Sequence, residues 1–183
     1  MDLKATTEKH LEAITEIAFA AAGGTIDKSY AAGAGVYNFE IAQPAIGKIL
    51  QIVNPNFEYE VISILKMDSL DMTDVHFKIV YDALSQIKCN RITLSMGTDR
   101  LIDLAEALSE LDTQYGQLRD KTIVVYGASL PERFKDSDAQ FNAGVAVGAV
   151  NVLPPGVYVA MSGLIYYPKN CKKDPETGKF VYK

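Results

Sequence analysis

Residues 17–27 read IAFAAAGGTID, a short apolar run that leads into two glycines and one hydroxyl residue, Thr25. An apolar run bounded by paired glycines is typical of a β-strand that ends in a tight turn. Two roles fit Thr25 at the end of such a strand. It is either a turn residue that caps the segment after it, or a nucleophile that the glycine turn presents.

The composition is that of an ordinary globular protein. Of the 183 residues, 48% are hydrophobic and 22% are charged, which fits one domain with a sizeable core. The formal net charge of −5 argues against a nucleic-acid partner, because phosphate binding needs concentrated Lys and Arg. We expect residues 15–183 to form a single domain that follows a polar N-terminal extension, residues 1–14.

Membrane and metal sites are not indicated. No apolar run approaches the length of a membrane span, and the N-terminus lacks the features of a secretory signal. Cys89 and Cys171 stand far apart, and the two histidines, His10 and His76, show no metal-ligand spacing. Free thiols fit a reducing compartment. The sequence therefore predicts a cytoplasmic protein without a membrane partner or a metal.

Hydrophobic patterning predicts an α/β fold. Short apolar, often β-branched runs indicate strands at residues 15–21, 59–65, 91–95, 122–127 and 157–162. Helices are expected between them, at residues 44–54, 73–88, 99–111 and 138–152. Strands that alternate with helices form a mainly parallel sheet with helices on both faces, which is a three-layer, Rossmann-like arrangement.

Two predicted helices have an apolar face that can be assigned to particular residues. In the first, which Thr73 would cap, the face is expected at Val75, Ile79, Ala83 and Ile87. In the second, it is expected at Leu101, Leu104, Ala105 and Leu108. Residues 28–39 are instead a long loop rich in small residues, and they are a candidate lid.

Gly, Ser, Thr and Asp gather directly after the predicted strands. They form the stretches GGTID (23–27), KMDSLDM (66–72), MGTDR (96–100), GAS (127–129) and SG (162–163). Ligands bind at the carboxyl ends of the strands in open α/β sheets, so these loops predict a small polar pocket. The loops hold no His or Cys, so a nucleophile there is Ser or Thr, and its base is Asp, Lys, Tyr or water.

The same loops resemble the bacterial-type L-asparaginase/glutaminase family. The resemblance rests on GGTID, the SLDM quartet (69–72), MGTD (96–99), the YGAS turn (126–129) and LPPGVYVAM (153–161), in this order. It covers residues 16–183 and implies the amino-terminal, catalytic domain of that family. The implied reaction is hydrolysis of the side-chain amide of L-asparagine, or of a related small amide, through an acyl-enzyme with release of ammonia. It implies no metal or organic cofactor.

The resemblance also implies roles for particular residues. Thr25 matches the primary threonine nucleophile, and Tyr37, rather than Tyr30, looks like the mobile tyrosine that closes over it. Ser69 matches the serine that contacts the α-carboxylate of the substrate. Gly24 belongs to the glycine turn, whose backbone N–H groups can approach a developing oxyanion.

A second group of matching residues lies further along the chain. Thr98 matches the second catalytic threonine, and Asp99 matches the aspartate that contacts the α-amino group of the substrate; Gly97 precedes them in the same loop. Lys173 matches the lysine that works with both, although Lys172 lies one position away. A lysine can take a proton when burial lowers its pKa towards neutrality. The alternatives are a helix N-cap for Asp99 and a solvated basic tail for Lys173.

Three departures from the family bear on the substrate. Met96 stands where the family has a histidine, GAS replaces GAM, and Arg100 stands where the family has a small hydroxyl residue. Arg100 is either a surface helix charge, a cation that opposes a neutral Lys173, or a ligand for an additional carboxylate.

Full-size family members carry a second domain, and a neighbouring subunit helps to complete the pocket. We therefore expect a homo-oligomer, a dimer or a tetramer. Two alternatives to the enzyme are a catalytically weak protein that binds a small amino acid, and a subunit that is active only in a hetero-complex.

Overall fold

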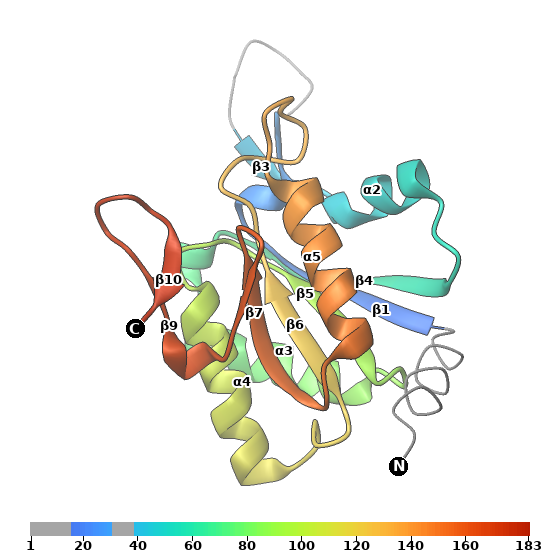
Figure 1. The fold of residues 1–183 in the computed structure, drawn as a ribbon, viewed down its shortest axis with the longest axis vertical. Coiled ribbons are helices and arrows are strands. Elements are labelled where there is room, and N and C mark those ends of the chain that lie inside the picture. The colour runs from blue at the N-terminus through green and yellow to red at the C-terminus, as the bar shows by residue number, and fades with distance from the viewer. Residues whose placement is uncertain (1–15, 31–38) are drawn as a thin grey trace, which may run out of the picture.

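The computed structural model describes residues 16–30 and 39–183, and within them the centre of the fold is a six-stranded sheet (Figure 1). The strands are β1 (Glu16–Gly23), β4 (Glu58–Met67), β5 (Arg91–Ser95), β6 (Thr122–Tyr126), β7 (Gly156–Met161) and β8 (Leu164–Tyr166). Their order is β4-β1-β5-β6-β7-β8, and all pairs are parallel except β7 with β8. The five predicted strands are confirmed. The antiparallel β8 has no predicted counterpart, because three residues are too few to show a pattern.

Helices cover both faces of the sheet, as predicted. They are α2 (Ala45–Val53), α3 (Asp74–Gln86), α4 (Leu101–Tyr115) and α5 (Ala139–Val152). One hydrophobic cluster joins α3 and α4 to the sheet, and a second cluster joins α2 and α5 to the opposite face (Figure 1). The predicted three-layer arrangement is confirmed. Helix α4 extends beyond its predicted end until Gly116 stops it in the left-handed conformation, with φ 69°.

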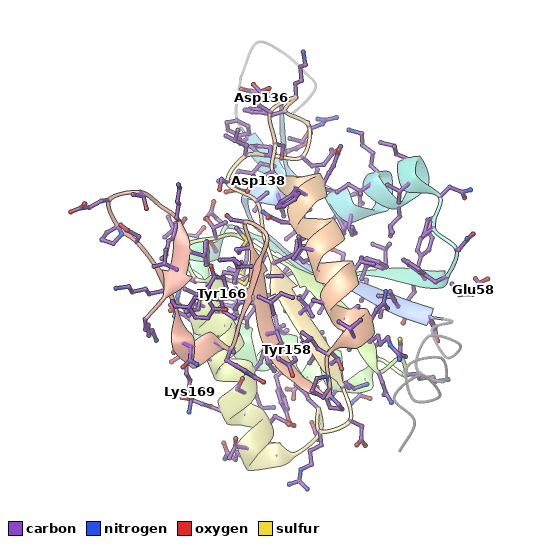
Figure 2. All side chains as sticks on the ribbon, in the orientation of Figure 1. Glu58, Asp136, Asp138, Tyr158, Tyr166 and Lys169 are labelled. Carbon is purple, nitrogen blue, oxygen red and sulfur yellow. The ribbon has the colours of Figure 1, made fainter. Side chains whose placement is uncertain are left out.

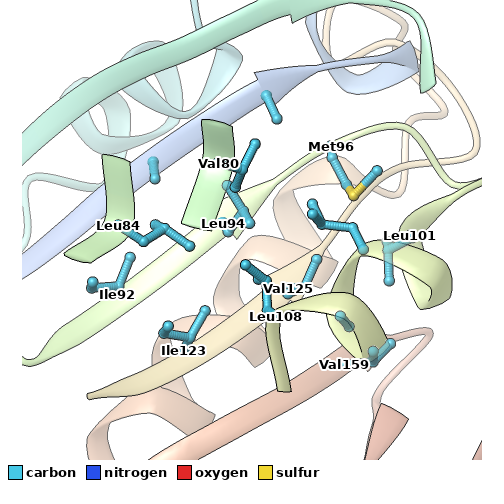
Figure 3. Close-up of a cluster of buried hydrophobic side chains, with 14 of the residues drawn as sticks. Val80, Leu84, Ile92, Leu94, Met96, Leu101, Leu108, Ile123, Val125 and Val159 are labelled. Atoms are coloured by element: carbon cyan, nitrogen blue, oxygen red, sulfur yellow. The ribbon is translucent and has the colours of Figure 1, made fainter. Parts of the chain in front are cut away.

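The two predicted apolar faces can be compared with the side chains that are buried between the sheet and the α3/α4 layer (Figure 3). The face of α4 is confirmed, since Leu101, Leu104, Ala105 and Leu108 are all buried. The predicted face of α3 is wrong at its first two positions, although Ile87, the C-cap of the helix, is buried. The buried residues within α3 are Phe77, Val80, Tyr81 and Leu84, whereas Val75 is 69% exposed and Ile79 is 44% exposed. A constant spacing of four residues drifts by about 40° per step around an α-helix, so the predicted stripe leaves the core.

Two short hairpins lie outside the central sheet. Strand β2 (Lys28–Tyr30) pairs with β3 (Phe39–Ile41), and β9 (Cys171–Lys173) pairs with β10 (Phe180–Tyr182). The predicted lid loop is therefore a hairpin at its two ends, where the rings of Tyr30 and Phe39 stack with centroids 4.6 Å apart. Its middle, residues 31–38, and the predicted extension, residues 1–14, lie outside the described residues. The domain boundary at residue 15 stays a prediction.

The strand order decides where a ligand can bind. In chain order, the parallel strands lie in the spatial sequence 2-1-3-4-5, because the chain goes from β1 to β4 on one side and then crosses to β5 on the other. Such a reversal is a topological switch point, and it leaves a crevice outside the carboxyl ends of the two strands that flank it. Here those strands are β1 and β5, so the loops after them face the same crevice.

A buried carboxyl group joins the end of β1 to helix α2. Asp27 is 4% exposed, and its Oδ1 accepts a hydrogen bond of 2.8 Å from the backbone N–H of Ala45, the first residue of α2. Its backbone oxygen accepts a second hydrogen bond, of 2.9 Å, from the N–H of Ala42. Burial raises the pKa of Asp27 to about 7, against the opposing effects of the Ala45 N–H and of Lys66.

The raised pKa gives folding a defined pH dependence. Between about pH 4 and pH 7 the folded chain keeps the proton on Asp27 while the unfolded chain loses it, so the free energy of unfolding is expected to fall as pH rises. The slope is up to about 1.4 kcal/mol per pH unit within that window. In Asp27→Asn this contribution is absent. Urea denaturation from pH 4.5 to 7.5 measures it, with the exposed Asp136→Asn as control, and equal slopes in all three proteins would contradict the assignment.

Candidate functional site

Three loops meet at the switch point through contacts that only glycine permits. They are the Thr25 turn (residues 23–27) after β1, the Ser69 loop (residues 68–72) after β4, and the Thr98 loop (residues 96–100) after β5. A β-carbon on Gly24, whose φ is 84°, would lie 2.0 Å from the backbone nitrogen of Gly97. A β-carbon on Gly97 would in turn lie 2.4 Å from the hydroxyl oxygen of Ser69. The absence of side chains at Gly24 and Gly97 therefore brings the three loops together.

Thr25 lies at this junction, partly exposed, as the first residue of the short 3-10 helix η1 (Thr25–Asp27). Gly24 is the N-cap of η1, and no side chain caps it, so Thr25 does not have the capping role that its position also allowed. The N–H of Gly24 donates to the backbone oxygen of Met67 at 3.0 Å. Gly24 is thus engaged with the sheet and contributes shape to the site rather than a free donor. Tyr37, the predicted mobile tyrosine, lies outside the described residues.

Lys173 is brought to the Thr98 loop from the β9–β10 hairpin. Its Nζ donates to Asp99 Oδ1 at 2.8 Å and to Thr98 Oγ1 at 3.2 Å. The side chains of Lys173 and Asp99 are 32% and 46% exposed, so the cluster faces solvent on one side. Lys172 is exposed and pairs with Val181 across the hairpin, and the contacts with Thr98 and Asp99 come from Lys173.

The structure does not support the two alternative roles, a helix N-cap for Asp99 and a solvated basic tail for Lys173. The N-cap of helix α4 is Arg100, whose side chain makes no capping hydrogen bond, so Asp99 is not the cap. The carboxylate of Asp99 instead accepts a hydrogen bond from Lys173, a residue 74 positions away. Because Lys173 belongs to a paired strand and contacts two side chains of the Thr98 loop, it is not part of a free basic tail.

Ser69, the predicted carboxylate contact, is 2% exposed and begins the short helix η2 (Ser69–Asp71). Asp68 orders this loop, since its Oδ1 accepts from the N–H of Leu70 at 3.1 Å. Its Oδ2 lies 2.6 Å from Lys28 Nζ, and the hydrogen bond from Lys28 lowers the pKa of Asp68. Sequence reasoning missed this pair, because two opposite charges 40 positions apart give no local signal.

The side chains at two departures from the family, Met96 and Arg100, have partners within the chain. Met96 is fully buried and packs in the α3/α4 core cluster, close to Leu101 (Figure 3). Arg100 is held by Asp103, to which its Nε donates at 2.9 Å, and by the backbone oxygen of Met72, to which its Nη1 donates. Its guanidinium carbon lies 4.6 Å from the ring centroid of Phe77. These contacts occupy the guanidinium, so they do not support the alternative in which Arg100 binds an additional carboxylate.

A further polar residue supports the neighbouring loops. Asn142 in α5 is fully buried, and its Nδ2 donates to the backbone oxygen of Gly127 at 3.0 Å and to Asp138 Oδ2 at 2.9 Å. Its Oδ1 accepts from the N–H of Ser162 at 3.0 Å. Asp138, at the start of α5 (Figure 2), also accepts from the N–H of Ser129 at 2.8 Å. Sequence reasoning did not assign these roles. The available signal was an Asn near the start of a helix rich in Ala, Val and Gly.

Two other classes of site receive no support in the described parts of the chain. Within residues 16–30 and 39–183, no group of three or more His, Cys, Asp or Glu is placed to hold a metal ion. Cys89 and Cys171 are both buried and free. None of the helices in the same residues has the combined length and hydrophobicity that a membrane crossing requires.

Comparison with known families identifies the fold. Residues 16–178 match the family model described as "Asparaginase, N-terminal". The chain belongs to the asparaginase family. The match covers the three loops of the site and reaches beyond Lys173. No curated protein matches the sequence significantly.

Solved structures of the asparaginase family share this fold. The thermostable L-asparaginase from Thermococcus kodakarensis has a TM-score of 0.77 and 22% identity over 92% of this chain and 51% of its own. L-asparaginase I from Vibrio cholerae has a TM-score of 0.75 and 21% identity over 93% of this chain and 52% of its own. A probable cytoplasmic L-asparaginase from Campylobacter jejuni has a TM-score of 0.70 and 20% identity, over 87% and 49%. The chain therefore spans about half the length of these relatives.

The close approach of the loops can be tested with one glycine of the site and one outside it. Gly24→Ala is expected to lower the free energy of unfolding by about 1–3 kcal/mol, because φ is positive and the β-carbon would overlap Gly97. Gly144→Ala, in the exposed face of α5 with nothing within 4 Å, is expected to raise it by about 0.5–1 kcal/mol. Chemical denaturation measures both changes. A Gly24→Ala protein as stable as the wild type would contradict the contact.

Proposed function

We propose that this protein is an amidohydrolase of the asparaginase type that hydrolyses the side-chain amide of L-asparagine, or of a related small amide, to the acid and ammonia. The cluster of Lys173, Thr98 and Asp99 is the observation that carries the proposal. An amine held between a hydroxyl and a carboxylate, at a crevice beside a glycine turn, provides what a hydroxyl nucleophile needs for proton transfer. Membership of the asparaginase family supports the same conclusion.

The proposed reaction starts at Thr25. Its Oγ attacks the carboxamide carbon, the C–N bond breaks, and the nitrogen takes a proton and leaves as ammonia. Water then attacks the resulting ester, which releases the acid and restores the Thr25 hydroxyl. Backbone N–H groups of the Thr25 turn and of the Thr98 loop are the proposed donors to the oxyanion. Since Gly24 already donates to Met67, we propose that it acts through its shape.

The remaining residues of the site are assigned to binding and proton transfer. Asp99, whose carboxylate is half-exposed, is the proposed partner of the α-amino group of the substrate, and Ser69 is the proposed partner of its α-carboxylate. Lys173 and Thr98 are proposed to move the proton of the nucleophile. Because the side chain of Lys173 is still 32% exposed, bound substrate and the segment with Tyr37 would supply the exclusion of water.

Three parts of the function stay predictions. The substrate is predicted to be L-asparagine or a related small amide such as L-glutamine. A homo-oligomer, either dimer or tetramer, is proposed on the ground that a neighbouring subunit completes the pocket in the family. The cytoplasmic location is proposed by analogy with the relative whose name includes that location. The proposed chemistry itself calls for no metal or organic cofactor.

Ammonia release from L-asparagine, L-glutamine and a panel of small amides tests the nucleophile. Thr25→Ala is expected to lose at least about 10³-fold in kcat, since the acyl-enzyme cannot form. Thr113→Ala, an exposed threonine on α4, is the control and is expected to keep wild-type rates. If the wild type releases no ammonia but L-aspartate raises its Tm, the enzyme proposal is wrong, and the alternative of an amino-acid-binding protein is supported.

The two adjacent lysines offer a matched test of the cluster. Lys173→Met is expected to lower kcat by about 10²-fold or more, because Thr98 and Asp99 lose their shared partner. Lys172→Met removes the same charge one residue away, from an exposed side chain, and is expected to change kcat by less than about twofold. Steady-state kinetics with the best amide of the panel compares the two variants. A larger loss of kcat in Lys172→Met than in Lys173→Met would show that the active lysine is assigned wrongly.

A further inference from the structure

We infer that Arg100 and Lys28 are positioning residues that hold the Ser69 loop from its two ends, so that Ser69 can meet the α-carboxylate of the substrate. This inference rests on the proposed function, because it concerns how that substrate is recognised. Neither residue is needed as a ligand: each acts through the loop that it contacts. The resemblance to the asparaginase family assigned neither role, since Arg100 departs from the pattern of that family and Lys28 was not among its site residues.

The Ser69 loop has little internal structure of its own. It contains a single turn, η2, in which the N–H of Asp71 donates to the oxygen of Asp68 at 3.1 Å and the N–H of Met72 donates to the oxygen of Ser69 at 3.2 Å. A turn of three residues is too short to hold its geometry without outside contacts. Its hydroxyl residue, Ser69, is nevertheless buried and touches the place where the Thr98 loop passes. Contacts from other segments must therefore fix it.

Arg100 supplies the contact at the far end of the loop. It belongs to the Thr98 loop, and its Nη1 donates to the backbone oxygen of Met72. Two further contacts hold the guanidinium, namely the 2.9 Å hydrogen bond to Asp103 and the ring face of Phe77. A planar guanidinium can satisfy these partners at once, whereas an ammonium cannot reproduce the same fork of donors. Arg100 thus connects the end of the Ser69 loop to the start of α4.

Lys28 supplies the contact at the near end. It lies in β2, directly after the Thr25 turn, and its Nζ is 2.6 Å from Asp68 Oδ2. The other oxygen of Asp68 accepts from the N–H of Leu70, so the same carboxylate joins Lys28 to the turn itself. About three quarters of each side chain in this ion pair is buried. The Ser69 loop is thereby connected to the Thr25 turn on one side and to the Thr98 loop on the other.

The consequence concerns binding of one substrate group. The contact with the α-carboxylate is expected in the ground state and in the transition state alike, so a loosened Ser69 loop should weaken binding and leave kcat nearly unchanged. An amide that lacks this carboxylate makes no such contact. Loss of Arg100 or Lys28 should therefore raise KM for L-asparagine and Kd for L-aspartate, with little effect on 3-aminopropanamide, which is asparagine without its α-carboxylate.

The experiment compares Arg100→Gln, Arg100→Lys and Lys28→Gln with two controls of equal charge change, Arg119→Gln and Lys88→Gln, at exposed positions. KM for L-asparagine and Kd for L-aspartate are expected to rise by about 10-fold or more in all three variants and in neither control, while kcat stays within about threefold. Arg100→Lys separates positioning from a general electrostatic field, because a field effect would be restored by the retained charge. Wild-type KM in Arg100→Lys, or an equal loss on 3-aminopropanamide, would overturn the inference.

A readout that does not depend on activity keeps the two proposals distinguishable. Amide hydrogen exchange at Leu70, Asp71 and Met72 is expected to accelerate by about 10-fold or more in Arg100→Gln and Lys28→Gln, while the core strand β5 keeps its protection. Unchanged exchange at these amides would overturn the positioning role even if the protein hydrolyses asparagine. If the wild type neither releases ammonia nor binds L-aspartate, the proposed function and this inference are both wrong. Faster exchange in the two variants would then not count as support.

Discussion

The approach of Gly24 to Gly97 sets the spacing on which the rest of the site depends. At the switch point between β1 and β5, neither loop has room for a β-carbon, so the backbones themselves are in contact. This contact places the Thr25 turn and the Thr98 loop side by side, and Gly97 in turn leaves just enough room for Ser69. The three loops therefore behave as one layer at the carboxyl edge of the sheet, and a shift in one is transmitted to the other two.

Much of the fold could be predicted from short-range patterns. The buried strands are continuous apolar runs, and α4 shows its core face directly, because Leu101, Leu104, Ala105 and Leu108 keep the i, i+3, i+4, i+7 spacing. In α3 two patterns compete. The aliphatic residues at intervals of four suggested one face, while the tertiary structure buries the larger surface that includes Phe77 and Tyr81. Residue size and the position of the sheet decide such cases, and neither is visible in a periodicity alone.

The site could be predicted only as far as its residues lie in recognisable loops. Lys173 was predicted through the family resemblance, but its contacts with Thr98 and Asp99 depend on the β9–β10 hairpin, which no local pattern predicts. The contacts of Arg100 with Met72 and of Lys28 with Asp68 were out of reach, because they join residues 28 and 40 positions apart whose separation in space depends on the whole sheet. Met96 is the opposite case, in which the position in the sequence suggested the site and the structure shows the core. It follows a strand in a site loop, yet its side chain belongs to the core.

The position of Lys173 has a consequence for how the site is assembled. Its two partners, Thr98 and Asp99, follow the third strand of the sheet in chain order, while Lys173 itself comes from a hairpin more than seventy residues later. Closing so long a loop carries an entropic cost that only the completed sheet can offset. Lys173 is therefore synthesised more than seventy residues after Thr98 and Asp99, and a nascent chain that ends at β6 still lacks the cation of this cluster.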